Sequence, residues 1–205
     1  VILRMLIEKE LPLSLDKLIA IGTEEESVVP GVKDATEELK QFFHDRLRVM
    51  QKDQGFTAHE VESVIGSEPA ILADVPKRLK AVHDFMSLPE AESLAAANKR
   101  IENILKKNTL PLADAVDPAL LTEKEEKDLY EAIRTLEPKL EADYKAGRYE
   151  DELRSLAPLK APVDAFFDKV MVNAEDEALR RNRLTLLNEL HKAMNQVAKL
   201  SCLAS

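Results

Sequence analysis

The chain has 205 residues, a length that suits one large domain or two small ones with a substantial buried core. Hydrophobic residues make up 45% of the chain, but aromatic residues are only 4% and glycines only 5, which favours helices around an aliphatic core. The formal net charge of −9 argues against a generic nucleic-acid-binding protein coated in positive charge, and the single cysteine, Cys202, excludes an intramolecular disulfide.

The first part of the chain begins with a short apolar stretch. Residues 1–10 are interrupted by charge too soon for a signal peptide or a membrane span, and we expect them to end a helix that begins in a missing N-terminal region. Turn residues mixed with an acidic run predict a loop from Gly22 to Gly31. Apolar residues at helical spacing then predict an amphipathic helix over residues 34–54, which Gly55 ends.

Two further helices and a turn complete this part. Thr57 and Glu60 have the spacing of a capping box, which predicts the start of a short helix. Pro76 suits the first turn of the next helix. That helix is expected to turn four side chains inward: Leu79, Val82, His83 and Met86. A Ser-Leu-Pro turn follows, and there we place the boundary between two helical units, residues 1–88 and 89–205.

The second unit is also predicted to be helical. An apolar face runs through residues 94–105 in a helix that ends before Pro111. A second capping box, from Thr122 to Glu125, opens a long helix that Pro138 should kink or split.

The end of the chain completes the bundle. Gly147 ends the long helix, and a short helix is expected over residues 149–156. The last helix is expected over residues 175–200, with Cys202 near it as a small core residue. Because the chain shows neither strand-like alternation nor a tandem repeat, we predict an all-α, bundle-like pair of units.

Positive charge is concentrated in two segments of the second unit. Residues 90–110 carry a net charge of +1 and residues 176–205 carry +2, whereas residues 1–89 carry −5 and residues 111–175 carry −7. Two local basic strips are therefore expected on an otherwise negative molecule.

Four stretches resemble a single family. They are VILRMLIEKELPLSLDKLI at the start, FFHDRLRVMQKDQG in the middle, NKRIENIL from Asn98 and PVDAFFDKVMVNAEDEALRRNRLTLL from Pro162. Together the chain resembles, over nearly its whole length, the C-terminal part of the bacterial glycyl-tRNA synthetase beta subunit. That family ends in a helical anticodon-binding domain of the DALR type, named for an Asp-Ala-Leu-Arg motif. Here the motif reads Glu177-Ala178-Leu179-Arg180, a conservative departure at its first position.

The resemblance carries expectations for function. It implies that residues 89–205 form the DALR-type domain and bind the anticodon region of glycine tRNA, within a cytoplasmic ligase that aminoacylates tRNA with ATP. It implies an alpha subunit as partner, a tetramer of two alpha and two beta chains, and ATP and magnesium for the whole enzyme. In this chain we expect no catalytic residue, cofactor or metal ligand, and no role at a membrane or on DNA.

The first basic segment offers candidate tRNA contacts. Lys99, Asn103 and Lys106 lie together on the helix side opposite Ile101, with Arg100 beside them. Lysine and arginine neutralise phosphates, and asparagine bonds sugar or base edges. A solvated polar face, which any surface helix needs, is the other interpretation.

The second basic segment contains three arginines with different expected roles. Arg180 and Arg181 point away from the apolar stripe and are candidate tRNA contacts. Arg183 falls within the stripe, where a partly buried guanidinium needs a partner, and Asp164 or Asp168 on the preceding segment is the expected one.

Phe166 and Phe167 are candidates for stacking on an unpaired loop base. Adjacent helical residues point about 100° apart, so we expect at least one of them in the core and the other near its edge. The glycine anticodon presents two cytosines, whose amines are donors best matched by Asp or Glu.

Two other functions are left open. One is a helical scaffold that docks partner helices without binding RNA. The other, weaker, is a free-standing hydrolase that uses His44 and nearby carboxylates such as Asp45, although no second ligand stands at a recognisable spacing.

Overall fold

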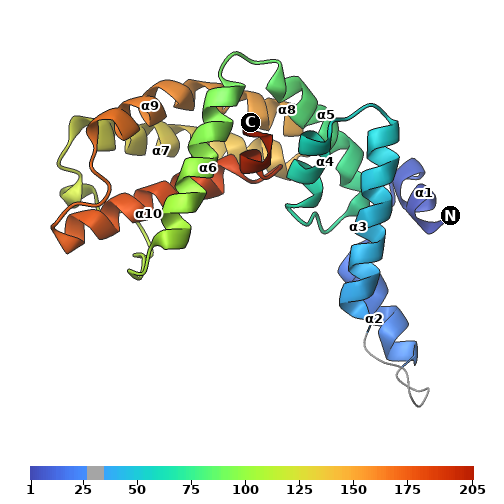
Figure 1. Ribbon diagram of the computed structural model, residues 1–205. Helices are drawn as coiled ribbons and strands as arrows, with labels where there is room; N and C mark the ends of the chain where they lie inside the picture. Colours follow the sequence, from blue (N-terminus) through green and yellow to red (C-terminus); the bar gives the residue numbers. More distant parts are fainter. Residues whose placement is uncertain (27–34) are drawn as a thin grey trace.

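The computed structural model describes residues 1–26 and 35–205, which form helices joined by short loops (Figure 1). The α-helices are α1 (Ile2–Glu8), α2 (Leu15–Glu26), α3 (Thr36–Asp53), α4 (Ala58–Ile65), α5 (Val75–Met86), α6 (Ala91–Lys107), α7 (Lys124–Lys145), α8 (Tyr149–Arg154), α9 (Lys160–Lys169) and α10 (Glu177–Met194). Four 3-10 helices lie between or after them: η1 (Leu72–Asp74), η2 (Pro118–Leu120), η3 (Ala157–Leu159) and η4 (Leu200–Leu203). Within these residues the only β pairing is an isolated bridge between Ser14 and Ile71, so the all-α class is confirmed.

The helices form an elongated molecule. In Figure 1, α1, α2 and α3 lie at one end and α6, α7, α9 and α10 at the other, with α4, α5 and the C-terminus between them. The buried apolar residues nevertheless form one connected core, from Leu3 to Ala204. Contacts continue across residue 88, because α5 packs against α8 and α4 packs against η4.

Several local signals act as expected. The Thr57 hydroxyl accepts from the Glu60 amide, and the Glu60 carboxylate accepts from the Thr57 amide, so the first capping box is confirmed. Gly55 follows α3 with a φ of +96°, the left-handed conformation that glycine adopts without strain. Pro76 lies in the first turn of α5, where the amide it lacks has no helical partner.

The loop predicted from residue 22 is wrong in its first part. Residues 22–26 belong to α2, and residues 27–31 lie outside the described part of the chain. Glutamates are good helix formers, and one glycine inside a helix costs only about 1 kcal/mol. The Thr23 hydroxyl donates to the Ile19 and Ala20 carbonyls, so it too is satisfied within the helix.

The start of α7 and its proline also differ from expectation. The capping box is formed by Glu123 and Glu126, one residue later than predicted, and Thr122 donates to Glu126 from outside the helix. Pro138 does not split α7, which continues to Lys145. Pro138 is exposed, so water can satisfy the carbonyl that loses its helical donor.

The short helix after Gly147 and the last helix are both shorter than predicted. The former, α8, ends at Arg154, and α10 ends at Met194 rather than near residue 200. The side-chain amide of Asn195 makes two hydrogen bonds. Its Nδ2 donates to the His191 carbonyl at 2.6 Å, and its Oδ1 accepts from the backbone amide of Leu200 at 3.0 Å. These side-chain hydrogen bonds replace the backbone hydrogen bonds of the helix, so α10 ends and the chain changes direction before η4.

His83 does not point inward as predicted. Its side chain is 63% exposed and reaches the Glu60 carboxylate at 2.9 Å. The position lies at the edge of the buried face of α5, where a polar ring is more favourably placed in water.

Candidate nucleic-acid interface

Helix α6 separates an apolar face from a cationic one. Leu94 and Ile101 are fully buried, and Asn98 lies between them with no exposed surface. The opposite face exposes Lys99, Asn103 and two further lysines near the C-terminal end of the helix. Because residues four apart share a helix face, the packing of the first face against α10 and η4 fixes where the second one points.

A first hollow of about 350 Å³ lies along the exposed face of α6. Its lining includes the cationic and polar residues of that face: Lys99, Arg100, Asn103 and Lys107. Ile104 and the C-terminal residues Ala204 and Ser205 complete it.

A second hollow of about 460 Å³ lies where α6 meets α10. It is lined by Ile104, Lys107, Asn108, Thr109, Leu110, Asn173, Arg180 and Leu184. The two hollows share Ile104 and Lys107, so Lys99 and Arg180 belong to one continuous surface rather than to opposite sides of the molecule. Figure 1 shows α6 and α10 crossing at this place. We call the lining of both hollows the α6–α10 surface.

The lysines on the exposed face of α6 lack their nearest acidic partner. Glu102 stands three residues after Lys99 and four before Lys106, the spacings at which helical ion pairs form. It instead accepts from the Ser201 hydroxyl at 2.9 Å and contacts His191 Nε2 at 3.2 Å. Burial opposes ionisation of Glu102, but these hydrogen bonds outweigh it and lower the pKa of the carboxyl. The Glu102 carboxylate therefore contacts α10 and η4 and does not pair with the lysines of its own helix.

The two phenylalanines of α9 have separate environments. Phe166 is fully buried, so its proposed contact with an RNA base is wrong and it is a core residue. Phe167 is half-buried at the edge of the core, and the Arg100 guanidinium lies 4.2 Å from its ring centroid. This cation–π contact holds Arg100 against α9 and covers one face of the ring.

Arg180 and Arg181 lie in the first turns of α10, but their side chains have different surroundings. Asp176 caps the helix by accepting from the amides of Ala178 and Leu179. Arg181 pairs with Glu177 at 3.0 Å and lines neither hollow. Arg180 lines the second hollow. In both arginines the Nε is buried and has no hydrogen-bond partner among the described residues.

Arg183 is structural, but its expected partner is wrong. Its Nε donates to the Glu126 carboxylate of α7 at 2.6 Å, and the pair is almost completely buried. Asp164 instead pairs with Lys160, and Asp168 is exposed. Arg183 also donates to the Met171 carbonyl at 2.8 Å, so it fixes the loop before α10.

Sequence reasoning missed several polar residues of the surface, among them Lys107, Asn173, Asn108 and Thr109. Lys107 lines both hollows, and Asn173 lines the second one. The spacing of Lys99, Asn103 and Lys107, four residues apart each time, was a usable signal for the first of these. Lys106, which was predicted, is exposed but lines neither hollow. Nothing in the sequence brings Asn173 to α6.

The alternative sites gain no support. In the described part of the chain, no group of three or more His, Cys, Asp or Glu side chains is arranged to hold a metal ion. Burial lowers the pKa of His44, with Arg48 adding to the effect. No described helix is both long and apolar enough to cross a membrane.

Comparisons with known proteins show the family of the C-terminal part of the chain. Residues 94–201 match the family model of the DALR anticodon binding domain, and this range contains every Lys and Arg of the two basic segments. It also contains most of the residues that line the two hollows.

Curated relatives match the chain at high identity. It is 51% identical over 208 residues to the glycine-tRNA ligase beta subunit of Delftia acidovorans, and 49% identical over 204 residues to that of Dechloromonas aromatica; each match covers 100% of this chain and 29% of the relative. The protein of the same name from Methylobacillus flagellatus is 53% identical over 171 residues, covering 83% of this chain and 24% of the relative. The chain thus spans less than a third of the length of the relatives it matches.

Proposed function

This chain belongs to the DALR anticodon binding domain family, and from that premise we propose that its α6–α10 surface binds the anticodon region of glycine tRNA. The observation that supports the location is the joining of the two hollows through Ile104 and Lys107, which brings the two basic segments together. The exposed face of α6 is either a tRNA contact or an ordinary solvated polar face. An RNA-binding experiment distinguishes the two, because a solvated face would not bind RNA.

The proposed mechanism is positioning. Lys99, Lys107 and Arg180 hold phosphates, which fixes the tRNA without reading its sequence. The chain as a whole has a net charge of −9 and repels a polyanion such as RNA. RNA is therefore expected to approach where these positive side chains lie.

We propose that the second hollow accepts one unstacked anticodon base. Ile104, Leu110 and Leu184 give it apolar walls, and Asn173 and Thr109 give it polar groups. Neither hollow is lined by Asp or Glu, so the acceptor for a cytosine amine would be the Asn173 amide oxygen or the Thr109 hydroxyl. The nearby Asn108 is already engaged, because its side chain bonds both backbone groups of Leu110.

For the longer protein we propose the activity that its relatives' name states, joining glycine to its tRNA. As the family resemblance implies, we propose that the whole enzyme consumes ATP with magnesium, pairs with an alpha subunit in a tetramer of two alpha and two beta chains, and works in the cytoplasm. We propose that the present chain binds the anticodon region and that other parts of the enzyme catalyse the aminoacylation.

The test is binding of this chain to labelled glycine tRNA, measured by fluorescence anisotropy between about 50 and 200 mM salt. We expect affinity to fall steeply with salt because several phosphates are neutralised. Replacing one anticodon cytosine should weaken binding by about fivefold or more, since a mismatched base typically costs roughly 1 to 3 kcal/mol. A salt-insensitive complex, or equal affinity for both tRNAs, would contradict the proposal.

Two neighbouring arginines give a matched pair of variants. Arg180→Ala should weaken binding by about fivefold, whereas Arg181→Ala should change it by less than about twofold, because only Arg180 lines the second hollow. Equal effects would remove Arg180 from the site. If neither the wild-type chain nor the variants bind RNA, the scaffold alternative replaces the proposal, although no comparison supports it at present.

A further inference from the structure

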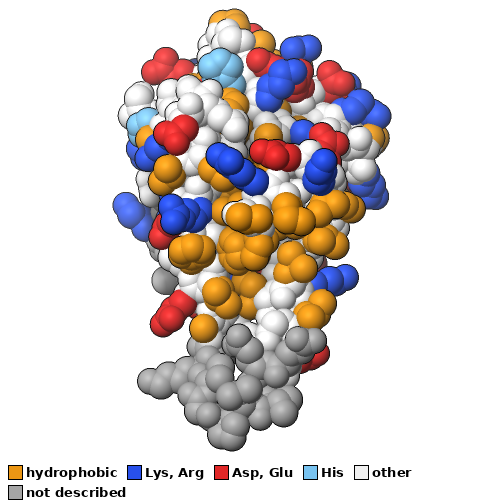
Figure 2. All heavy atoms as spheres, turned by 90° about the vertical axis from the view of Figure 1, so that its right-hand side faces the viewer, with side chains coloured by type: hydrophobic (Ala, Val, Ile, Leu, Met, Phe, Trp, Pro, Cys, Tyr) orange, Lys and Arg blue, Asp and Glu red, His pale blue; other side chains and the backbone are white. Residues whose placement is uncertain are grey.

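The opposite end of the molecule exposes an apolar face. Six large hydrophobic side chains are exposed there, one just before α1 and the others in α1 and α3: Val1, Ile2, Met5, Leu39, Phe42 and Val49. Figure 2, which views the molecule from the side of α1 and α3, shows a broad apolar area there, bordered by basic and acidic side chains. Val1, Ile2, Phe42 and Val49 lie together in this region, because they line one hollow. Single exposed hydrophobic residues are ordinary, but a contiguous group marks a contact surface.

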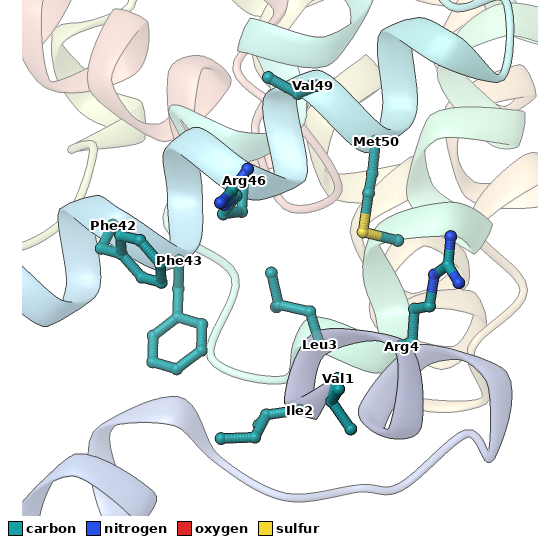
Figure 3. Close-up of a pocket in the computed structure, with 9 residues that line it drawn as sticks. All are labelled: Val1, Ile2, Leu3, Arg4, Phe42, Phe43, Arg46, Val49 and Met50. Carbon is teal, nitrogen blue, oxygen red and sulfur yellow. The ribbon is translucent and has the colours of Figure 1, made fainter.

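The face is hollowed into a groove of about 470 Å³ between α1 and α3. Figure 3 shows Leu3 and Phe43 directed into it from the two helices, with Met50 further along α3. Phe42 and Val49, which are 55% and 56% exposed, stand at its open side. Of the apolar positions that define the inner face of α3, only Leu47 is fully buried, so this helix lacks a partner along part of its length.

The charges of the groove have one sign. Arg4 and Arg46 line it, no Asp or Glu does, and neither arginine forms a salt bridge with a described residue. The Arg46 guanidinium lies 5.7 Å from the Phe42 ring centroid, at the border of the apolar area. An occupant that matches this groove has an apolar face with carboxylates at its edge.

The groove therefore differs from the α6–α10 surface in the ligand it fits. Its lining is mainly apolar, whereas an RNA loop needs phosphate contacts as well as stacking. A second copy of this chain is also a poor match, because a symmetric pair would bring like-charged arginines together.

We propose that this groove is the contact site for the remainder of the longer polypeptide, through a segment that is apolar on one face and acidic at its edge. The length of the relatives supports this occupant, since more than two thirds of the Delftia acidovorans and Dechloromonas aromatica proteins lies outside the match. In these relatives a large body of polypeptide is joined to the region that matches this chain, and its high effective concentration favours it over a free partner.

The test measures how fast an introduced thiol reacts. Val49→Cys is made in a Cys202→Ser background, both in this chain and in a chimera where it replaces the matching 29% of the Delftia acidovorans relative. Maleimide labelling at that site is followed by peptide mass spectrometry. We expect labelling to be at least about tenfold slower in the chimera, because a covered site reacts only when it opens. Met171→Cys, at a side chain 70% exposed on the distant loop before α10, should react equally in both.

Three results would overturn the proposal. Equal rates at Val49→Cys in the two proteins would show that the remainder does not cover the groove. Protection that grows with protein concentration would indicate a second copy, and protection that appears only after an alpha subunit is added would indicate that subunit. If the chimera folds poorly, Met171→Cys reports it by a changed rate.

A second variant makes the test independent of labelling. Val49→Asp should leave the melting temperature of the isolated chain unchanged, because the side chain is exposed there. It should lower that of the chimera, where a carboxylate would be buried against apolar side chains. No change in either protein would also overturn the proposal.

Discussion

Helices α6 and α7 are both polar on their outer faces, yet they use charge in opposite ways. Four of the five cations of α7 form salt bridges: Lys124, Arg134, Lys139 and Lys145. The four of α6, which are Lys99, Arg100, Lys106 and Lys107, form none with a described residue. The difference arises because Glu102 of α6 faces α10 and η4, whereas the acids of α7 lie beside its lysines.

This comparison teaches that the number of cations is a poor guide to an RNA surface. Cations that are already paired gain little from a phosphate, because the existing partner must first be displaced. Most cations of α7 are paired with neighbouring acids, whereas the cations of the α6–α10 surface are not. The largest effects on stability are expected at the buried, internal charges, and smaller effects on RNA binding are expected at the unpaired ones.

Glu152 of α8 is the strongest departure from internal pairing. It is fully buried, and neither carboxylate oxygen has a hydrogen-bond partner among the described residues. Burial and the neighbouring Asp143 raise the pKa of the carboxyl to about 8, although Arg78 opposes them. Below its ordinary pKa of 4.5 the group is protonated in both the folded and the unfolded protein, so it adds no pH dependence to stability. Between pH 4.5 and 8 the unfolded chain releases the proton and the folded protein keeps it, so stability is lost progressively across this range and the loss is complete above pH 8.

Replacing Glu152 should remove this loss. Glu152→Gln keeps the shape but carries no charge, so at pH 8 it should be more stable than the wild type by on the order of 4 kcal/mol, while at about pH 4.5 the two should be nearly equal. Urea unfolding at the two pH values measures the difference. A stability gap that does not change with pH would mean that the buried carboxyl finds a partner or water.

The second prediction breaks the link between α7 and α10. Arg183→Met leaves the Glu126 carboxylate buried without its guanidinium, and we expect a loss of about 3 kcal/mol or more in the free energy of unfolding. Urea titration measures it. Since Arg183 also holds the Met171 carbonyl, tRNA affinity should fall with it through the loop that carries Asn173.

The matched control adds Glu126→Gln to Arg183→Met. Glutamine keeps an acceptor for the Thr122 and Glu123 amides but removes the buried charge, so the double variant should regain about 1 to 2 kcal/mol. A double variant less stable than Arg183→Met alone would show that the carboxylate is not the source of the loss.

The sequence was sufficient for features decided within a few residues. The first capping box, Gly55 and the helical periodicity of α6 follow local rules, so the all-α class and most helices could be predicted. The start of α7 and the end of α10 were misplaced because Thr122 donates to the Glu126 side chain instead of capping the helix, and the Asn195 side chain bonds the His191 carbonyl and the Leu200 amide. Such choices of partner depend on the packing around them.

The candidate site was predictable only where a helix face alone determines it. Lys99, Arg100 and Asn103 share a face of α6 and could be named from spacing. The partner of Arg183 could not, because Glu126 lies 57 residues away and reaches it only when α7 packs on α10. The direction of Glu102, which leaves the lysines unpaired, likewise depends on His191 and is a tertiary property.

The third prediction tests paired against unpaired lysines directly. Lys99→Ala with Lys107→Ala should weaken glycine-tRNA binding by about tenfold or more at low salt, and should reduce the slope of log affinity against log salt by about 2. The control, Lys124→Ala with Lys145→Ala, removes the same charge from α7 but should change affinity by less than about twofold, since both lysines are held by acids. Equal effects would mean that only net charge matters.

The smallest expected effect separates two adjacent residues of α6. Lys106 and Lys107 are both exposed and have the same charge, so any long-range attraction to RNA treats them alike. Lys107 lines both hollows and Lys106 lines neither, so only a contact at the α6–α10 surface distinguishes them. Lys107→Ala should weaken binding by about fivefold and Lys106→Ala by less than about twofold in the same anisotropy titration. The reverse order would place the phosphates at Lys106, outside the two hollows, and would contradict a contact that Lys107 and Arg180 share.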